Sequence, residues 1–296
     1  MTKSKSAEHS ESIQELGRVV AGAYSDNQSI RVAGLNRVRD VIRKKREGIA
    51  FDEVEKKKKE KDYAKTYQDT NLSKLLDTML AKKMLTAGEH NYIAEILAIS
   101  KESAKLETRY KKLMLAYVES ELIYQEFLQH VRGVGAVMSA KMINYFGDCS
   151  KYEHVSSLWK HVGMHVVDGK APRKKKGEKL DFNPKLRSFV WLIGDSFVKQ
   201  RSPIYRDLYD REKTRQAELV KAGAENAPKS KLHADFRARR KMVKIFLAHY
   251  YLCARELTGQ ETGEPYVQSK LGHKDIIGWK QVVNANRELK EKIKVA

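Results

Sequence analysis

The feature that most constrains this chain is a stretch of more than 40 residues, 89–132, that contains neither proline nor glycine. Such a stretch can continue as one helix, because proline breaks a helix and glycine weakens it. Thr86 stands three residues before Glu89, which is the pattern of a capping box at a helix N-terminus. The sequence therefore predicts a long connector helix over residues 86–131.

The apolar positions of this stretch form a heptad seam whose phase changes near Glu107. Ser100 and Glu121 interrupt the seam with polar side chains. A seam of this kind can pack on the protein's own helices or on a second copy in a coiled-coil homodimer, and the spacing favours neither. The positions are Ile93, Leu97, Ser100, Ala104, Tyr110, Met114, Tyr117, Glu121, Tyr124, Leu128 and Val131.

The region before the connector is also predicted to be helical. Residues 1–12 are polar and predict a disordered tail, whereas apolar side chains recur at helical spacing through residues 13–85. A turn is expected at 25–27, where Ser-Asp-Asn separates two amphipathic segments, and residues 56–61 are expected to form an exposed charged helix or linker. No alternation of strands and helices occurs, and only residues 164–167 are candidates for a brief strand. The predicted fold class is all-α.

Composition indicates the kind of partner. Lysine and arginine number 58 against 38 acidic residues, a formal net charge of +20. An excess of this size attracts polyanions, so nucleic acid is the first expected partner; an anionic membrane surface and an unpartnered basic surface are the alternatives. The chain has no apolar run of membrane-spanning length and no secretory signal, and its two cysteines exclude a disulfide scaffold. We expect a soluble, intracellular protein.

A bend bounded by glycines follows the long helix, at Gly133-Val134-Gly135. Glycine permits positive φ and lets a ligand approach the backbone, and Val134 is expected to pack into the small core that joins the flanking helices. The second helix then begins near Ala136, where the first N–H groups have no intrahelical acceptor and complement a phosphate. The residues predict a helix-hairpin-helix element that binds the phosphate backbone of a nucleic acid. A simple glycine-rich helix connection is the alternative.

Basic residues elsewhere are expected to extend this interface. Residues 170–179 form a polar loop with six basic side chains and one acidic side chain. Further along, four basic residues follow the spacing i, i+3, i+4, i+7 and so share one face of a helix: Arg237, Arg240, Lys241 and Lys244. Phe236 of the same helix is expected to point away from this face, towards the core. This stripe favours contact with a phosphate backbone, and an ordinary solvated face is the alternative. The predicted DNA-binding residues are Arg132, Gly133, Val134, Gly135, Ala136, Lys141, Lys174, Lys175, Lys176, Arg237, Arg240, Lys241 and Lys244.

Several segments in residues 124–257 resemble, in order and spacing, the C-terminal helix-hairpin-helix domain of the RNA-guided insertion-sequence transposases. In that family a nuclease-like N-terminal domain precedes a C-terminal domain that bears a nucleophilic serine, and the two are joined by a coiled coil that the long helix before Gly133 also resembles. The resemblance implies a domain that holds DNA. The segments are Val131-Arg132-Gly133-Val134-Gly135, Phe146-Gly147-Asp148, Leu158 to Met164, Asn183-Pro184-Lys185-Leu186-Arg187 and His233 to Lys241.

The chain departs from that family at both sources of catalysis. Asp168 stands where the resemblance predicts the serine, and an aspartate cannot form the phosphoserine linkage to DNA. The family's nuclease-like domain needs strands that carry metal-binding carboxylates, whereas residues 1–120 are predicted to be charged helices. The resemblance therefore implies a relative of the DNA-holding half without its catalytic groups.

No other catalytic, metal or cofactor site is predicted. The spacing of Cys149, His154, His161 and His165 matches no familiar zinc pattern, and no phosphate-binding P-loop occurs. We expect a nucleoid-associated, non-catalytic protein that binds duplex or branched DNA with low sequence specificity. The alternatives are an active transposase that acts in DNA recombination and a protein that binds structured RNA. The expected organisation is a tail at 1–12, a basic helical region at 13–85, the connector at 86–131, the hairpin domain at 124–257 and an extension at 258–296.

Overall fold

The computed structural model describes residues 2–48, 66–167, 169–173, 176–262 and 277–295. Within these residues the regular structure is helical, and the one pair of bridged residues is Val167 with Lys170. The all-α prediction is therefore confirmed. The predicted linker at 56–61 lies outside the described residues. The chain divides into two compact units, Met1–Met114 and Leu115–Ala296.

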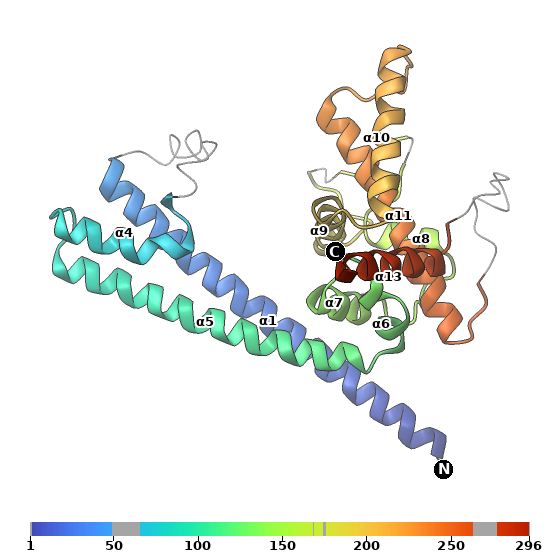
Figure 1. Ribbon diagram of the computed structural model, residues 1–296, viewed down its shortest axis with the longest axis horizontal. Helices are drawn as coiled ribbons and strands as arrows, with labels where there is room; N and C mark the ends of the chain where they lie inside the picture. Colours follow the sequence, from blue (N-terminus) through green and yellow to red (C-terminus); the bar gives the residue numbers. More distant parts are fainter. Residues whose placement is uncertain (1, 49–65, 168, 174–175, 263–276, 296) are drawn as a thin grey trace. The chain divides into compact units, whose positions relative to one another are not determined.

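The first unit consists of α1 (Thr2–Glu47), α4 (Asp69–Ala81) and most of α5 (Ala87–Glu119), as Figure 1 shows. The turn predicted at 25–27 is wrong, because α1 continues through it. The Nδ2 of Asn27 donates to the carbonyl of Ser103 on α5 (2.8 Å), so this polar side chain joins two helices and does not end one. The helix also includes residues 2–12, for which composition predicts a disordered tail; this segment contains no proline or glycine.

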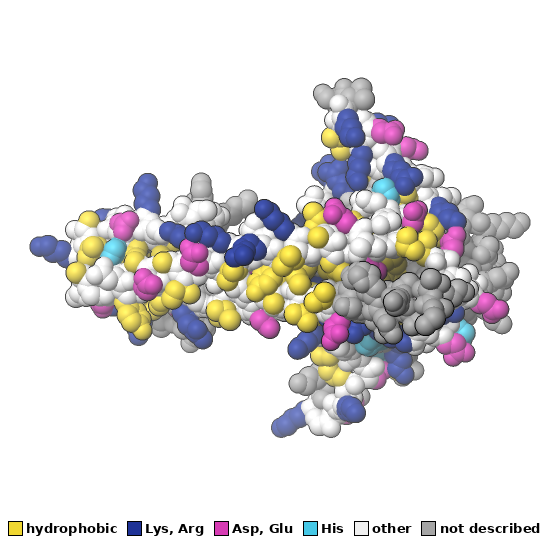
Figure 2. All heavy atoms as spheres, turned by 90° about the horizontal axis from the view of Figure 1, so that it is seen from below, with side chains coloured by type: hydrophobic (Ala, Val, Ile, Leu, Met, Phe, Trp, Pro, Cys, Tyr) yellow, Lys and Arg dark blue, Asp and Glu magenta, His cyan; other side chains and the backbone are white. Residues whose placement is uncertain are grey.

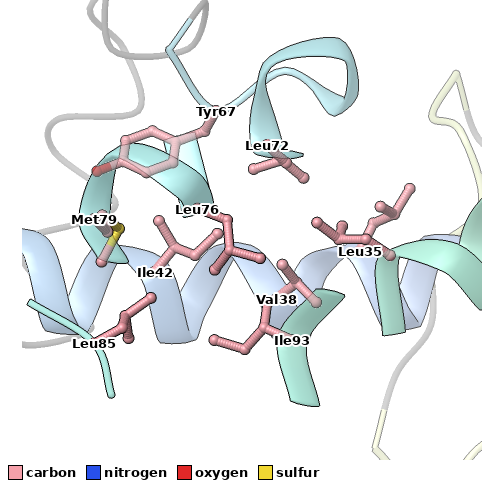
Figure 3. Close-up of a cluster of buried hydrophobic side chains, with 10 residues drawn as sticks. Leu35, Val38, Ile42, Tyr67, Leu72, Leu76, Met79, Leu85 and Ile93 are labelled. Carbon is pink, nitrogen blue, oxygen red and sulfur yellow. The ribbon is translucent and has the colours of Figure 1, made fainter. Parts of the chain in front are cut away.

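Ten buried side chains form the core of this unit, and they come from all three helices and the two connections between them (Figure 3). α1 contributes three of them, α4 three and α5 two, while Tyr67 precedes α4 and Leu85 follows it. The predicted capping box at the start of α5 is confirmed. Thr86 N donates to Glu89 Oε2 (2.9 Å), and Glu89 N donates to Thr86 Oγ1 (3.2 Å). The core residues are Leu35, Val38, Ile42, Tyr67, Leu72, Leu76, Met79, Leu85, Ile93 and Leu97.

Beyond this core, α5 packs on α1 through polar side chains. Arg31 Nε donates to Glu107 Oε1 (2.5 Å) and Arg31 Nη2 to Glu107 Oε2 (3.3 Å), and the Glu107 side chain is only 6% exposed. Ser100 and Ser103 are buried at the same interface, whereas Ala104, a predicted seam position, is exposed. The seam thus packs on the protein's own helix, with its phase shifted by one residue at Ser103.

The connector helix ends at Glu119, so the prediction that it extends to Val131 is wrong. The hydroxyl of Ser120 donates to the carbonyl of Tyr117 (2.7 Å), and the N–H of Ser120 also bonds this carbonyl (3.2 Å). Both bonds reach back three residues and so compete with the helical pattern. The chain then forms a short helix, α6 (Leu122–Glu126), and the 3-10 turn η1 (Leu128–His130).

The second unit is built around α11 (Lys231–Leu257), which contacts α6, α8 (Val155–His161), α9 (Pro184–Gln200), α10 (Tyr205–Lys221) and α13 (Trp279–Val295). Gly194 permits the close crossing of α9 and α11, because a Cβ there would lie 2.7 Å from Val243 Cγ2. The rings of Phe197 and Tyr205 stack with centroids 4.6 Å apart, and Phe246 meets both edge-on. None of the described helices is both long enough and apolar enough to cross a bilayer.

Candidate nucleic-acid interface

The predicted hairpin lies between η1 and α7 (Ala136–Phe146). Gly133 has φ +99°, and a Cβ there would lie 3.1 Å from Ser196 Oγ and 3.3 Å from Phe197 Cδ1. Val134 is buried, as predicted. Gly135 differs from the prediction: its φ is −93° and nothing lies within 4 Å of a Cβ built there. Positive φ is therefore required at the first glycine only.

Two side chains from distant helices hold the bend. The Ser196 hydroxyl on α9 donates to the Gly133 carbonyl (2.7 Å), and the N–H of Arg132 donates to Asn286 Oδ1 on α13 (3.0 Å). Asn286 is itself buried, and its Nδ2 donates to the carbonyl of Val282. The N–H of Val134 donates to the carbonyl of Val131 (3.1 Å), which closes the turn. The bend is thus part of a fixed frame.

The first turn of α7 presents main-chain donors that the described protein does not use. Gly135 is the N-cap residue and has no side chain to accept a hydrogen bond. The N–H groups of Gly135, Ala136, Val137 and Met138 have no acceptor among the described residues. No acidic residue stands in this first turn. The donors therefore lie at the positive end of a helix dipole, in a bend whose N-cap residue is exposed.

The groups around the bend are mainly basic. Arg132 is exposed, and burial lowers the pKa of half-buried Lys141 on α7. From α13, Arg287 Nη2 lies 3.1 Å from His130 Nε2, and Lys290 Nζ donates to the carbonyl of Gln129 (3.2 Å). Burial lowers the pKa of His130, and these two cations lower it further. The C-terminal helix therefore adds positive charge beside the bend that the sequence analysis did not assign to it.

Gly133 and Gly135 should respond differently to alanine, which gives a test of the bend. At Gly133 an alanine must adopt positive φ and press on Ser196 and Phe197, so we expect a loss of about 1–3 kcal/mol in the free energy of unfolding. Gly135→Ala is the matched control, and it should cost clearly less, because its φ suits an L-residue and the only expected loss comes from alanine being a poorer N-cap than glycine. Denaturation followed by tryptophan fluorescence measures both. Equal losses in the two variants would contradict this geometry.

The basic loop falls only partly within the described residues. Lys176 is exposed, as are Lys170 and Arg173. Lys174 and Lys175, together with Asp168 at the expected serine position, lie outside the described residues.

The four residues of the predicted stripe share a face of α11, but each has a partner within the protein. Lys241 Nζ forms an ion pair with Glu212 on α10 (2.7 Å). Arg237 Nη1 donates to Gln216 Oε1 (3.1 Å) and to the carbonyl of Asn226 (2.5 Å). The stripe is therefore not the ordinary solvated face that was the alternative, and its contact with a phosphate backbone stays a prediction. Phe236 was placed incorrectly, since it is 48% exposed and its ring packs on Trp191.

The other two stripe residues belong to a half-buried cluster of cations, with Arg187 of α9. Arg240 Nη1 contacts the carbonyls of Gly163 (3.2 Å) and His165 (3.4 Å), and Lys244 Nζ lies 4.0 Å from the Trp159 ring centroid. Burial lowers the pKa of Arg240 to about 10, with a further contribution from Arg187. The pKa of Lys244 is lowered in the same way, by burial and then by Arg240.

Among the described residues, no ion pair neutralises Arg187, Arg240 or Lys244, so the cluster keeps its positive charge. The sequence analysis assigned no contact to Arg187. Its Nη1 donates to the carbonyl of Pro172 (2.7 Å) and its guanidinium lies over the Phe182 ring, so only the fold brings it to the stripe. Arg187 and Ser196 are about two and a half turns apart on α9, so they face opposite ways. The cation cluster and the bend are therefore separate surfaces.

The cysteines and histidines considered in the sequence analysis lie within the described residues. Both cysteines are buried, and burial raises the pKa of Cys149 and of Cys253 to about 12, which disfavours the nucleophilic thiolate. No group of three or more His, Cys, Asp or Glu side chains in the described ranges is placed to hold a metal ion. His161 bonds the Tyr152 hydroxyl (2.7 Å), and His165 pairs with Asp181 (3.0 Å).

Comparison of the chain with protein-family models, with curated proteins and with solved structures finds no match.

Proposed function

We propose that this protein binds duplex DNA through its sugar-phosphate backbone, with low sequence specificity and without cleaving it. The observation that carries this proposal is the first turn of α7, where the amides of Gly135 to Met138 have no acceptor in the described protein. A phosphate oxygen is the acceptor best suited to several converging N–H groups at the positive end of a helix. The net charge of +20 adds a long-range attraction for a polyanion.

Further observations favour a nucleic acid chain over a single phosphate ion. The unneutralised cluster of Arg187, Arg240 and Lys244 is a second cationic surface, and a polymer with many phosphates can reach both surfaces. Main-chain amides contact phosphates and not base edges, so they position a duplex without reading its sequence. The resemblance of residues 124–257 to the DNA-holding domain of insertion-sequence transposases supports the same partner.

The first test is the salt dependence of binding. We expect the affinity for a short labelled duplex to fall steeply between about 50 and 200 mM salt, with a log–log slope of roughly 0.9 for each phosphate neutralised. Fluorescence anisotropy with two duplexes of unrelated sequence measures both the slope and the specificity, and the two should bind alike. A flat salt response would contradict the proposal.

The second test addresses the bend itself through Gly135→Asp. The backbone of Gly135 suits an aspartate N-cap and leaves room for it, so the fold should be retained or slightly stabilised. The new carboxylate would occupy the amides and repel a phosphate, and we expect a loss of DNA affinity of about tenfold or more, which corresponds to at least ~1.4 kcal/mol. Gly135→Asn is the matched control, because it is equally large and can also cap the helix but carries no charge.

The outcome of this comparison decides between the bend and the rest of the surface. Equal binding by Gly135→Asp, Gly135→Asn and the wild type would show that the bend is not the site. If structured RNA bound more tightly than duplex DNA in a competition assay, RNA and not DNA would be identified as the partner. Strand cleavage or a covalent adduct on supercoiled DNA with Mg²⁺ would identify an active transposase instead.

A further inference from the structure

Helix α5 carries a second apolar stripe on the face that does not pack on α1. Four large side chains recur there at steps of seven residues: Tyr92, Ile99, Leu106 and Leu113. Their exposed fractions are 75%, 55%, 40% and 53%. A strict seven-residue repeat of exposed apolar side chains is the pattern of a helix that packs lengthwise against another helix. Within the described chain, no such helix covers this face.

Helix α1 extends this stripe into a broad face. Ile30 is 66% exposed and stands one position before Arg31, whose side chain bonds Glu107 on α5. Leu16, two heptads earlier on the same face of α1, is 60% exposed. The α5 stripe likewise stands one position before its packed residues. The two helices run antiparallel, because Asn27 bonds Ser103 while Lys45 bonds Glu89.

Both helices are right-handed and they run in opposite directions. The residue one position before each packed residue therefore points to the same side of the helix pair on α1 and on α5. The two exposed sets therefore form one surface of the α1/α5 hairpin. Figure 2 shows hydrophobic side chains gathered along these helices. An apolar surface of this length is unusual for a protein that remains a monomer.

We propose that this surface binds a second copy of the chain, with the two α5 helices antiparallel across a twofold axis near Glu102. The charge along α5 supports this partner. The helix has five acidic and five basic residues, so it carries no net charge although the whole chain carries +20. The like-charge repulsion that opposes self-association elsewhere is therefore absent along α5.

The order of those charges selects the antiparallel arrangement. With the axis near Glu102, Tyr92 of one copy lies opposite Leu113 of the other, and Ile99 lies opposite Leu106. Glu95 and Arg109 both lie beside the stripe, one in its first half and one in its second. In this arrangement Glu95 of one copy lies opposite Arg109 of the other. In a parallel arrangement Glu95 and Arg109 would each meet its own copy, which is unfavourable. In the antiparallel arrangement Glu102 meets its own copy near the axis, but Lys105 of the same helix pairs with it (2.7 Å) and offsets its charge. Two hairpins would then pack as a four-helix bundle.

The first experiment measures the molar mass of the full chain by light scattering after size exclusion. The chain mass is 34.0 kDa, and we expect twice that value for the wild type. The Leu106→Glu variant should be monomeric, because it buries a charge in the interface. Leu232→Glu on α11 is the matched control, since Leu232 is also exposed (61%) but lies outside the surface. Circular dichroism checks that both variants keep their helices. A wild-type chain with the mass of a monomer at micromolar concentration would overturn the proposal.

The second experiment tests the direction of the two helices by crosslinking single cysteines. Both native cysteines are buried, so a short bismaleimide should react only with an introduced one. Glu102→Cys lies near the proposed axis and should crosslink to its own copy in high yield. Glu95→Cys should not, because antiparallel helices place its two copies about 20 Å apart. Efficient crosslinking of Glu95→Cys would show a parallel arrangement and overturn the proposal.

Discussion

Replacement of Glu107 by glutamine is expected to lower the free energy of unfolding of Met1–Met114 by about 3 kcal/mol. Glu107 accepts two hydrogen bonds from Arg31 inside the α1/α5 interface, and its side chain is almost fully buried. Glutamine has a similar shape but no charge, so it leaves a guanidinium that is only 19% exposed without its main counter-charge. Asp69, at 3.7 Å from Arg31, compensates for a small part of this loss.

The two units can be followed separately in this experiment. All three tryptophans, Trp159, Trp191 and Trp279, lie in Leu115–Ala296. In the Glu107→Gln variant, the part of the circular dichroism signal that comes from the first unit should be lost at a urea concentration roughly 1 M or more below that of the wild type. The tryptophan fluorescence transition should stay in place. A common shift of both signals would contradict the assignment of this ion pair to the first unit alone.

The double variant Arg31→Met/Glu107→Leu is the matched control. It removes both charges and fills the space with apolar groups, and such exchanges are often neutral or stabilising. We therefore expect it to recover most of the stability that Glu107→Gln loses. Recovery would show that the pair is costly to break although it adds little net stability, which also explains how a polar interface is tolerated between two long helices.

Acidification is expected to destabilise the second unit through His249, by about 3 kcal/mol between neutral pH and pH 4. Burial lowers the pKa of His249 from 6.5 to about 4. The Tyr205 hydroxyl donates to Nδ1 (2.9 Å), and Nε2–H donates to the carbonyl of Ile277 (2.7 Å), an arrangement that uses the neutral ring. Between pH 6.5 and 4 the unfolded chain binds the proton more readily. The stabilisation is therefore complete above pH 6.5 and is lost as the pH falls towards 4.

The His249→Gln variant isolates this contribution. Glutamine can accept from Tyr205 and donate to Ile277 but does not titrate in this range. Burial also lowers the pKa of His130 and of His161, and these groups affect both proteins equally. Denaturation followed by tryptophan fluorescence at several pH values gives the free energy of unfolding as a function of pH. The slope of this function should be smaller in the variant than in the wild type by up to one proton, about 1.4 kcal/mol per pH unit. Identical slopes would show that His249 is not protected from protonation.

Local patterns in the sequence predicted the elements that depend on neighbouring residues. Thr86 and Glu89 form the predicted capping box because both partners lie within one turn. Predictions failed where the partner is distant in sequence. Asn27 was expected in a turn, but its side chain is bonded to Ser103, which lies 76 residues away. The end of the connector was missed for a different reason: the Ser120 hydroxyl bonds a carbonyl only three residues back, and a serine can make such a bond without ending a helix.

The candidate site shows the same division. The position of the bend could be predicted from Gly133, Val134 and Gly135, because a bend of this kind depends on consecutive residues. The stripe on α11 was predicted with the correct spacing, yet the spacing could not reveal that Glu212 neutralises Lys241. Arg187 was missed as a partner of Arg240 because the two lie on different helices, and only the packing of α9 on α11 unites them.

The bond between Arg132 and Asn286 joins positions 154 residues apart, and this separation has a consequence for newly made protein. Chains are synthesised from the N-terminus at about 5–20 residues per second, and folding generally follows that order. A nascent chain that has just exposed residues 131–138 has no α13 to hold the bend, and it acquires one only about 8–30 seconds later. We therefore expect the bend to reach its final geometry only after α13 has been synthesised, so the proposed phosphate contacts of its amides should form late.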